Sequence, residues 1–85
     1  MKVYVVSGHT GDDFDPNTWV AKVFLSERKA HSWVADADNM AAALLEKADG
    51  DCSKVRVSDH TLDPHFDISD SGTEYYIEEM DVEEL

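Results

Sequence analysis

Cysteine, proline, glycine and basic residues are all scarce in this chain of 85 residues. Cys52 is the only cysteine, so an internal disulfide cannot form and a secreted disulfide scaffold is excluded. No apolar run approaches the roughly 18 residues of a transmembrane helix, and Gly8 and His9 follow the apolar start too early for a signal peptide. We therefore expect one cytoplasmic domain spanning residues 1–85.

Lysine and arginine together number 7 against 19 aspartate and glutamate residues, so the formal net charge is −12. A surface of that sign repels phosphate groups, which excludes unaided binding to nucleic acid or to anionic membrane. Hydrophobic residues still make up 42% of the chain, which is enough for a folded core. The partner that suits such a surface is a basic protein.

The acidity is concentrated in the C-terminal third of the chain. Residues 57–85 contain ten Asp and Glu residues and no Lys or Arg, whereas residues 1–42 carry a net charge of only −2. A charge that served solubility alone would usually mix both signs over the whole surface. Two alternatives to a functional role stay open, namely a solvated acidic tail and a halophilic or solubilising coat. The apolar, β-prone run Tyr75–Ile77 argues against a tail that is disordered throughout.

The first 25 residues predict two strands. Lys2–Ser7 is rich in β-branched and aromatic residues without polar alternation, which is typical of a central strand covered on both faces. Gly8–Asn17 is rich in turn residues and predicts a loop. Thr18–Leu25 predicts the second strand. The alternation along it places four residues on one face: Trp19, Ala21, Val23 and Leu25.

A long helix is predicted over residues 27–48. Ser26 is a suitable N-cap, and Glu27 in the first turn complements the helix dipole. Gly50 marks the expected C-terminal stop. Apolar residues recur at helical spacing along one side: Ala30, Trp33, Val34, Ala37, Ala41, Leu44, Leu45 and Ala48.

Two further strands are predicted, a short edge strand over 54–58 and a last strand over 74–82. The order β-β-α-β-β defines an α+β fold, a small antiparallel sheet with one long helix packed on one face. The other face then needs a partner or a cover, because four large side chains are expected there: Trp19, Phe66, Tyr76 and Met80. Either a homodimer or partner contact covers this face, or residues 59–73 fold back over it as a lid.

The candidate metal ligands and the candidate catalytic residues do not form a recognised motif. Counted from Asp13, Asp15 and Asn17 stand at the third and fifth positions of a calcium loop, but the sixth position lacks glycine and the twelfth lacks glutamate. An irregular cation site at Asp12, Asp13 and Asp15 is left as the alternative. Cys52, His60 and His65 lack the short paired spacing of zinc ligands, and Cys52 lacks the surroundings of a nucleophile. We therefore predict no enzymatic activity, no cofactor and no metal.

Three strings carry a resemblance: Lys2–Val6 (KVYVV), Val23–Ala30 (VFLSERKA) and Tyr75–Met80 (YYIEEM). Together they resemble small phage and prophage proteins with a first strand, a V-F-x-S-x-x-K-A helix entry and a terminal Y-x-I-E-E strand. The resemblance covers about a third of the chain. It implies a phage setting, in which a small acidic protein resembles an anti-CRISPR protein or another DNA-mimicking inhibitor.

The predicted function is therefore an acidic DNA-mimicking inhibitor that binds the basic nucleic-acid-binding surface of a host defence complex, such as a CRISPR effector complex. It would act in the host cytosol as a monomer or homodimer. The alternative is a small interaction module or homodimer that uses the uncovered sheet face, with the acidity serving solubility only. The residues predicted to contact the partner are Asp59, Asp63, Asp67, Asp70, Glu74, Glu78, Glu79, Glu83 and Glu84.

Overall fold

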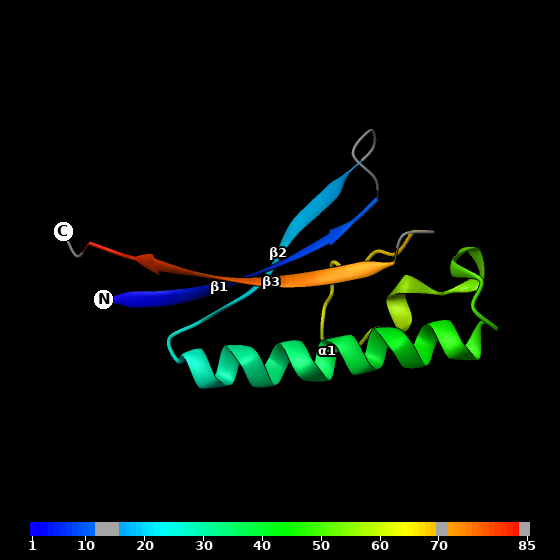
Figure 1. Ribbon diagram of the computed structural model, residues 1–85, viewed down its shortest axis with the longest axis horizontal. Helices are drawn as coiled ribbons and strands as arrows, with labels where there is room; N and C mark the ends of the chain where they lie inside the picture. Colours follow the sequence, from blue (N-terminus) through cyan, green and yellow to red (C-terminus); the bar gives the residue numbers. More distant parts are fainter. Residues whose placement is uncertain (12–15, 70–71, 84–85) are drawn as a thin grey trace.

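The computed structural model describes residues 1–11, 16–69 and 72–83. The strands β1 (Lys2–Thr10), β2 (Asn17–Phe24) and β3 (Thr73–Asp81) form one antiparallel sheet, and the long helix α1 (Glu27–Lys47) packs against one face of it (Figure 1). The predicted α+β class is confirmed. Within the described residues the sheet has three strands where four were expected.

β1 is the central strand, because the strand order is β2-β1-β3. It pairs with β3 along its whole length, from Lys2 opposite Asp81 to Thr10 opposite Thr73. The central position was predicted from the unbroken β-branched and aromatic run at the start of the chain, and the structure confirms it. The edge strands of the sheet are therefore β2 and β3.

α1 begins where the sequence predicts its cap. Ser26 has an extended backbone, and its Oγ accepts a hydrogen bond from the Lys29 backbone N–H at 3.3 Å. This bond satisfies one of the first-turn amides that lack a partner within a helix. The buried residues of α1 lie along the predicted apolar stripe: Ala30, Trp33, Ala37 and Ala41.

α1 ends after Lys47 through two residues with left-handed backbone, Asp49 (φ 56°) and Gly50 (φ 77°). Their N–H groups donate to the carbonyls of Glu46 and Leu45 at 3.0 Å and 2.9 Å, which is the pattern of a Schellman cap. The predicted end near residue 48 is confirmed. The first left-handed position holds an aspartate, where glycine would adopt the same backbone with less strain.

The edge strand predicted over 54–58 is wrong. The chain forms two short 3₁₀ helices there, Cys52–Lys54 and Val57–Asp59. The Asp51 carboxylate caps the first one by accepting from the Ser53 backbone N–H at 3.0 Å. These local bonds satisfy backbone groups that a strand could satisfy only beside another strand, so the alternating pattern does not produce a sheet edge.

A β-bulge in β2 changes which of its residues face the helix. Ala21 has no partner on β1, because the register shifts at this point. Trp19, Ala21 and Phe24 therefore pack on the helix side, whereas Val20 and Val23 lie exposed on the opposite face. The predicted grouping of Val23 with Trp19 is wrong, because the extra residue breaks the strict alternation of a regular strand.

The core lies between the centre of the sheet and α1. Val6 on β1 is fully buried, and Trp33 of α1 is nearly so. The Trp33 ring meets Tyr75 of β3 edge to face at 5.5 Å and lies 6.3 Å from the Phe24 ring. Aromatic contacts from two strands therefore hold the helix on the sheet.

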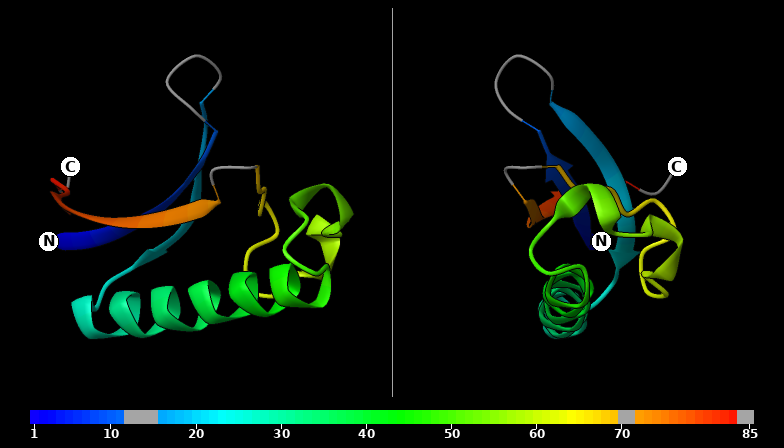
Figure 2. Two further views of the ribbon diagram at one scale, coloured as in Figure 1. Left: turned by 45° about the vertical axis from the view of Figure 1, so that its right-hand side comes forward. Right: turned by 90° about the vertical axis from the view of Figure 1, so that its right-hand side faces the viewer.

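The segment that follows the second 3₁₀ helix folds back beside α1, on the same side of the sheet (Figure 2). Phe66 is 4% exposed and stacks on His60 with ring centroids 4.4 Å apart. The prediction that residues 59–73 cover the other face is wrong, and so is the placement of Trp19 and Phe66 on that face. No described element lies over the far side of the sheet (Figure 2), so the expectation that the first strand is covered on both faces is wrong.

Candidate binding surfaces

Asp63 is the most buried acid among the described residues, with 1% of its surface exposed. One carboxylate oxygen, Oδ2, accepts hydrogen bonds from Trp19 Nε1 at 2.8 Å and from the Tyr75 hydroxyl at 2.7 Å. The other, Oδ1, accepts from the His65 backbone N–H at 3.0 Å. The carboxylate thus joins β2, β3 and the 60–69 segment, and it is not available to a partner.

The surroundings of the Tyr75 hydroxyl raise its pKa. Burial raises its pKa far above the usual value near 10, and the hydrogen bond to Asp63 and the negative charge of that carboxylate raise it further. The phenol therefore remains a hydrogen-bond donor throughout the neutral range. Its role is structural.

His60 holds the backbone of Asp63 in place. Its Nδ1 accepts from the Asp63 backbone N–H at 3.1 Å, and its Nε2 lies 3.0 Å from the Ala37 carbonyl oxygen. This arrangement assigns the ring proton to Nε2, which donates to the carbonyl. Both ring nitrogens are used within the fold, so a zinc site on His60 would require breaking these bonds.

Asp67 also has an internal role. Its carboxylate accepts from Asn17 Nδ2 at 2.9 Å, and its backbone carbonyl accepts from the Thr73 hydroxyl at 2.6 Å. Nearby, Thr10 Oγ1 accepts from the Ser69 backbone N–H at 2.9 Å. These bonds tie the 60–69 segment to the ends of all three strands.

The nine acids predicted to contact a partner therefore do not form one surface. Asp63 is internal and Asp67 is partly buried. Asp59, Glu83 and the acids of β3 are exposed, and Asp70 and Glu84 lie outside the described residues. The spacing of acids in the sequence did not reveal that the segment after residue 59 is held inside the fold by its own carboxylates.

The face of the sheet opposite α1 carries exposed apolar side chains, and we refer to it as the open face. It is formed by alternate residues of the three strands. Its apolar residues are Val3, Val5, Val20, Val23, Tyr76 and Met80, and its polar residues are Ser7, His9, Thr18, Glu74 and Glu78. Val20, Val23, Tyr76 and Met80 are 57%, 52%, 53% and 46% exposed. The predicted placement of Tyr76 and Met80 on this face is confirmed.

The carboxylates of the open face lie on β3. The Tyr76 hydroxyl donates to the Glu74 carboxylate, and this hydrogen bond raises the pKa of Tyr76. The His9 ring packs edge to face on Tyr76 at 6.4 Å. Lys22 does not reach this face, because its Nζ lies 5.7 Å from the centroid of the Phe24 ring on the helix side. Among the described residues, the open face has two carboxylates and no Lys or Arg.

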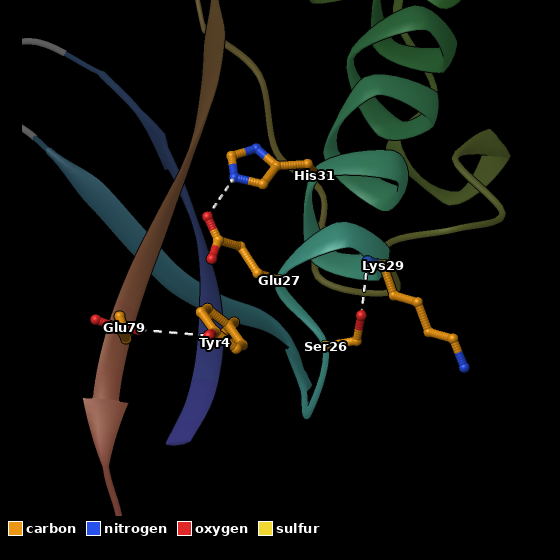
Figure 3. Close-up of polar contacts among 6 residues, drawn as sticks. All are labelled: Tyr4, Ser26, Glu27, Lys29, His31 and Glu79. Carbon is orange, nitrogen blue, oxygen red and sulfur yellow. Dashed lines mark hydrogen bonds and ion pairs between the residues drawn. The ribbon is translucent and has the colours of Figure 1, made fainter.

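A hollow of about 200 Å³ lies on the helix side, between the start of α1 and the sheet (Figure 3). It is lined by Tyr4, Glu27, His31, Ile77 and Glu79. The Tyr4 hydroxyl donates to Glu79 at 3.4 Å, and His31 Nε2 lies 3.7 Å from Glu27 (Figure 3). Partial burial and the nearby Glu79 and Glu27 charges raise the pKa of Tyr4. The hollow is smaller than a typical cavity for a cofactor or small ligand, which measures roughly 300–1,000 Å³.

Among residues 1–11, 16–69 and 72–83, no group of His, Cys, Asp and Glu side chains is arranged to hold a metal ion. The proposed irregular cation site at Asp12, Asp13 and Asp15 lies outside the described residues. Cys52 is partly buried in the first 3₁₀ helix. No described helix is long and apolar enough to cross a bilayer.

Comparison of the chain with protein-family models, with characterised proteins and with solved structures gives no match. The phage resemblance therefore stays a prediction.

The internal role of Asp63 is what sequence reasoning missed. A weak signal was present, since Asp63 stands between Leu62 and Pro64 and close to Phe66, in an apolar stretch that is unusual for a solvated loop. An acid in such a setting is either turned outward or hydrogen-bonded inside. The donors that decide between these outcomes, Trp19 and Tyr75, are distant in the sequence.

Proposed function

We propose that the protein is a non-enzymatic inhibitor that acts in the cytoplasm and binds the basic, nucleic-acid-binding surface of another protein. The observation that carries this proposal is the exposed row of acids along β3 and the residues after it. The row follows the length of β3 and alternates between its two sides: Glu74 and Glu78 lie on the open face, Glu79 and Asp81 on the helix side, and Glu83 lies beyond the strand. β3 is an edge strand, so a partner can approach the row from the side of the sheet as well as from its face.

The spacing of the carboxylates in this row can be compared with the spacing of phosphates in nucleic acid. The five carboxylates of the row occupy the nine residue steps from Glu74 to Glu83, and at about 3.4 Å per step the four intervals between them average about 7.7 Å. One strand of DNA carries a phosphate about every 3.4 Å of axis, and the duplex carries one about every 1.7 Å. The charge density of the row is therefore a little under half that of one nucleic-acid strand, and about a fifth of that of the duplex.

Basic partners are further favoured because cations near the row are few. Lys2 lies 3.4 Å from Glu79, and both side chains are more than half exposed, so this ion pair is weak. Glu74 and Glu78 have no ion pair with any Lys or Arg of the described chain. Their charge is available to lysine and arginine side chains of another protein.

The open face favours a second candidate, an interaction module that binds mainly through apolar contact while its acidity serves solubility. Four apolar side chains on this face are about half exposed, which is unusual for a small domain without a partner. The two candidates differ in salt dependence, because screening weakens contacts between charges and leaves apolar contacts largely unchanged.

The proposal is tested by capture from a nuclease-treated bacterial lysate, followed by competition. We expect the immobilised protein to retain nucleic-acid-binding proteins, duplex or single-stranded DNA to displace them, and retention to fall steeply between roughly 0.05 M and 0.5 M salt. Retention that DNA does not displace, or that is unchanged at high salt, contradicts the inhibitor proposal and supports the second candidate.

A matched pair of charge-reversal variants tests whether the location of the acids matters. Replacing Glu74, Glu78 and Asp81 by lysine changes the net charge by six units, from −12 to −6. The same change on exposed residues of α1 and its C-terminal cap uses Asp36, Glu46 and Asp49. We expect the first variant to lose far more binding, because close charge pairs contribute more than distant, screened ones. Equal losses would show that net charge alone drives association.

A further inference from the structure

The open face is a feature of the described structure that the fold itself does not use. Its exposed residues Val20, Val23, Tyr76 and Met80 come from both edge strands. On the central strand Val3 lies beside Met80, Val5 beside Val23, and Ser7 between Val20 and Tyr76. The face is thus continuous across the sheet, with Glu74 and Glu78 on its β3 side.

Charge argues against a second copy of this chain as the occupant. Two open faces packed against each other would bring together four carboxylates from Glu74 and Glu78, with no lysine or arginine on either face to pair with them. Burying unpaired carboxylates is strongly unfavourable, and the −12 charge of each copy adds long-range repulsion. The occupant must bring its own cations.

Geometry limits the form of the occupant. The backbone groups of β1 are paired with β2 and β3, so the face offers only side chains. An occupant must therefore satisfy its own backbone hydrogen bonds, as a helix does. The two edge strands lie about 10 Å apart, since neighbouring strands are about 4.8 Å apart, and a helix is also about 10 Å across.

We propose that the open face docks an amphipathic helix of a partner protein, with an apolar stripe against the valines, Tyr76 and Met80 and with lysine or arginine residues beside Glu74 and Glu78. This proposal rests on the proposed function for one property of the partner, its basic charge. It adds the form of the partner segment and the surface that receives it.

Three synthetic peptides of 18 residues serve as probes. The first is a helix with a leucine stripe bordered by lysines, the second has the same composition shuffled to remove the stripe, and the third keeps the stripe but carries glutamate in place of lysine. Binding is measured by fluorescence anisotropy at 0.1 M and 0.5 M salt, and the site is mapped by amide chemical shifts. We expect the first peptide to bind best, with the largest shifts on the open face.

Protein variants separate the apolar and charged parts of the contact. Val20→Thr with Val23→Thr keeps residues suited to strands, and we expect it to weaken binding of the first peptide about tenfold at both salt concentrations. Glu74→Gln with Glu78→Gln should weaken it severalfold at 0.1 M salt and much less at 0.5 M. The matched control is Val57→Thr, at an exposed valine of the second 3₁₀ helix, and it should leave binding unchanged.

The outcomes distinguish this proposal from the proposed function. If the shuffled peptide binds as well as the striped one, the docking proposal is overturned while basic partners still bind. If the third peptide binds as tightly as the first, the lysine contacts to Glu74 and Glu78 are refuted. Shifts confined to the outer edge of β3, or a dimer that Val20→Thr with Val23→Thr dissociates, would likewise overturn docking of a helix. Failure of both basic peptides would count against the proposed function as well.

Discussion

Replacing Asp63 by asparagine measures how much one buried carboxylate contributes to this fold. The amide has one acceptor oxygen, so its NH₂ group must replace either Oδ1 or Oδ2. Fewer hydrogen bonds are lost if the NH₂ group takes the position of Oδ1, because only the bond from the His65 N–H then disappears. The bonds from Trp19 and Tyr75 remain, but their acceptor is then a neutral amide oxygen. A hydrogen bond to a charged group contributes about 1.5–3 kcal/mol and a neutral one about 1 kcal/mol.

The net cost is smaller than the sum of these bonds, because the asparagine does not require a buried charge to be desolvated. We expect Asp63→Asn to lower the free energy of unfolding by about 2–4 kcal/mol. A domain of this length has a total stability of roughly 4–13 kcal/mol, so a large part of it would be lost. Urea unfolding followed by tryptophan fluorescence should show a midpoint lower by about 2 M or more, for a slope near 1 kcal/mol per M.

Asp59→Asn is the matched control, since it removes the same charge from an exposed side chain four residues away. We expect that variant to change stability by less than about 0.5 kcal/mol. If the two variants unfold at the same urea concentration, the hydrogen bonds to Asp63 do not stabilise the fold as argued. A gain in stability for Asp63→Asn would show that desolvation of the carboxylate outweighs its three bonds.

Three further predictions concern single positions. Gly8→Ala should cost about 1–3 kcal/mol, because its Cβ would overlap the Trp19 indole; thermal unfolding measures it, and an unchanged melting temperature contradicts it. Asp49→Gly should stabilise by about 0.5–1 kcal/mol through relief of the left-handed backbone, raising the melting temperature by a few degrees, whereas Asp49→Ala should not. The raised pKa of Tyr75 means that the unfolded chain ionises this group first above about pH 10. Stability should therefore hold below that pH and fall above it by up to about 1.4 kcal/mol per pH unit, and a Tyr75→Phe variant with the same alkaline loss would refute this.

The sequence by itself determined the elements whose signals are local. Ser26 caps the helix through the Lys29 amide one turn away, and the apolar stripe recurs within a few residues, so α1 could be placed almost to the residue. The run Val3–Val6 indicated a central strand for a similar reason. A chain with strands at both ends around one long helix has few ways to bury these residues, which is why the α+β class also followed.

The secondary structure and packing of residues 52–69 depended on the tertiary structure. The alternation at 54–58 suits a strand, but none of the described strands pairs with this segment, and local bonds around Asp51 form 3₁₀ turns instead. The bulge at Ala21 turns Val23 to the open face, and the alanine at the bulge is not a residue type from which a bulge could be predicted.

The same holds for the acids. Net charge and its concentration after residue 57 are properties of composition and were readable at once. Which carboxylates face solvent depends on donors brought from far along the chain, as Trp19 and Tyr75 are brought to Asp63. The sequence therefore determined that this protein presents negative charge, and the packing of the 60–69 segment against the helix side decided that β3 and the open face present it.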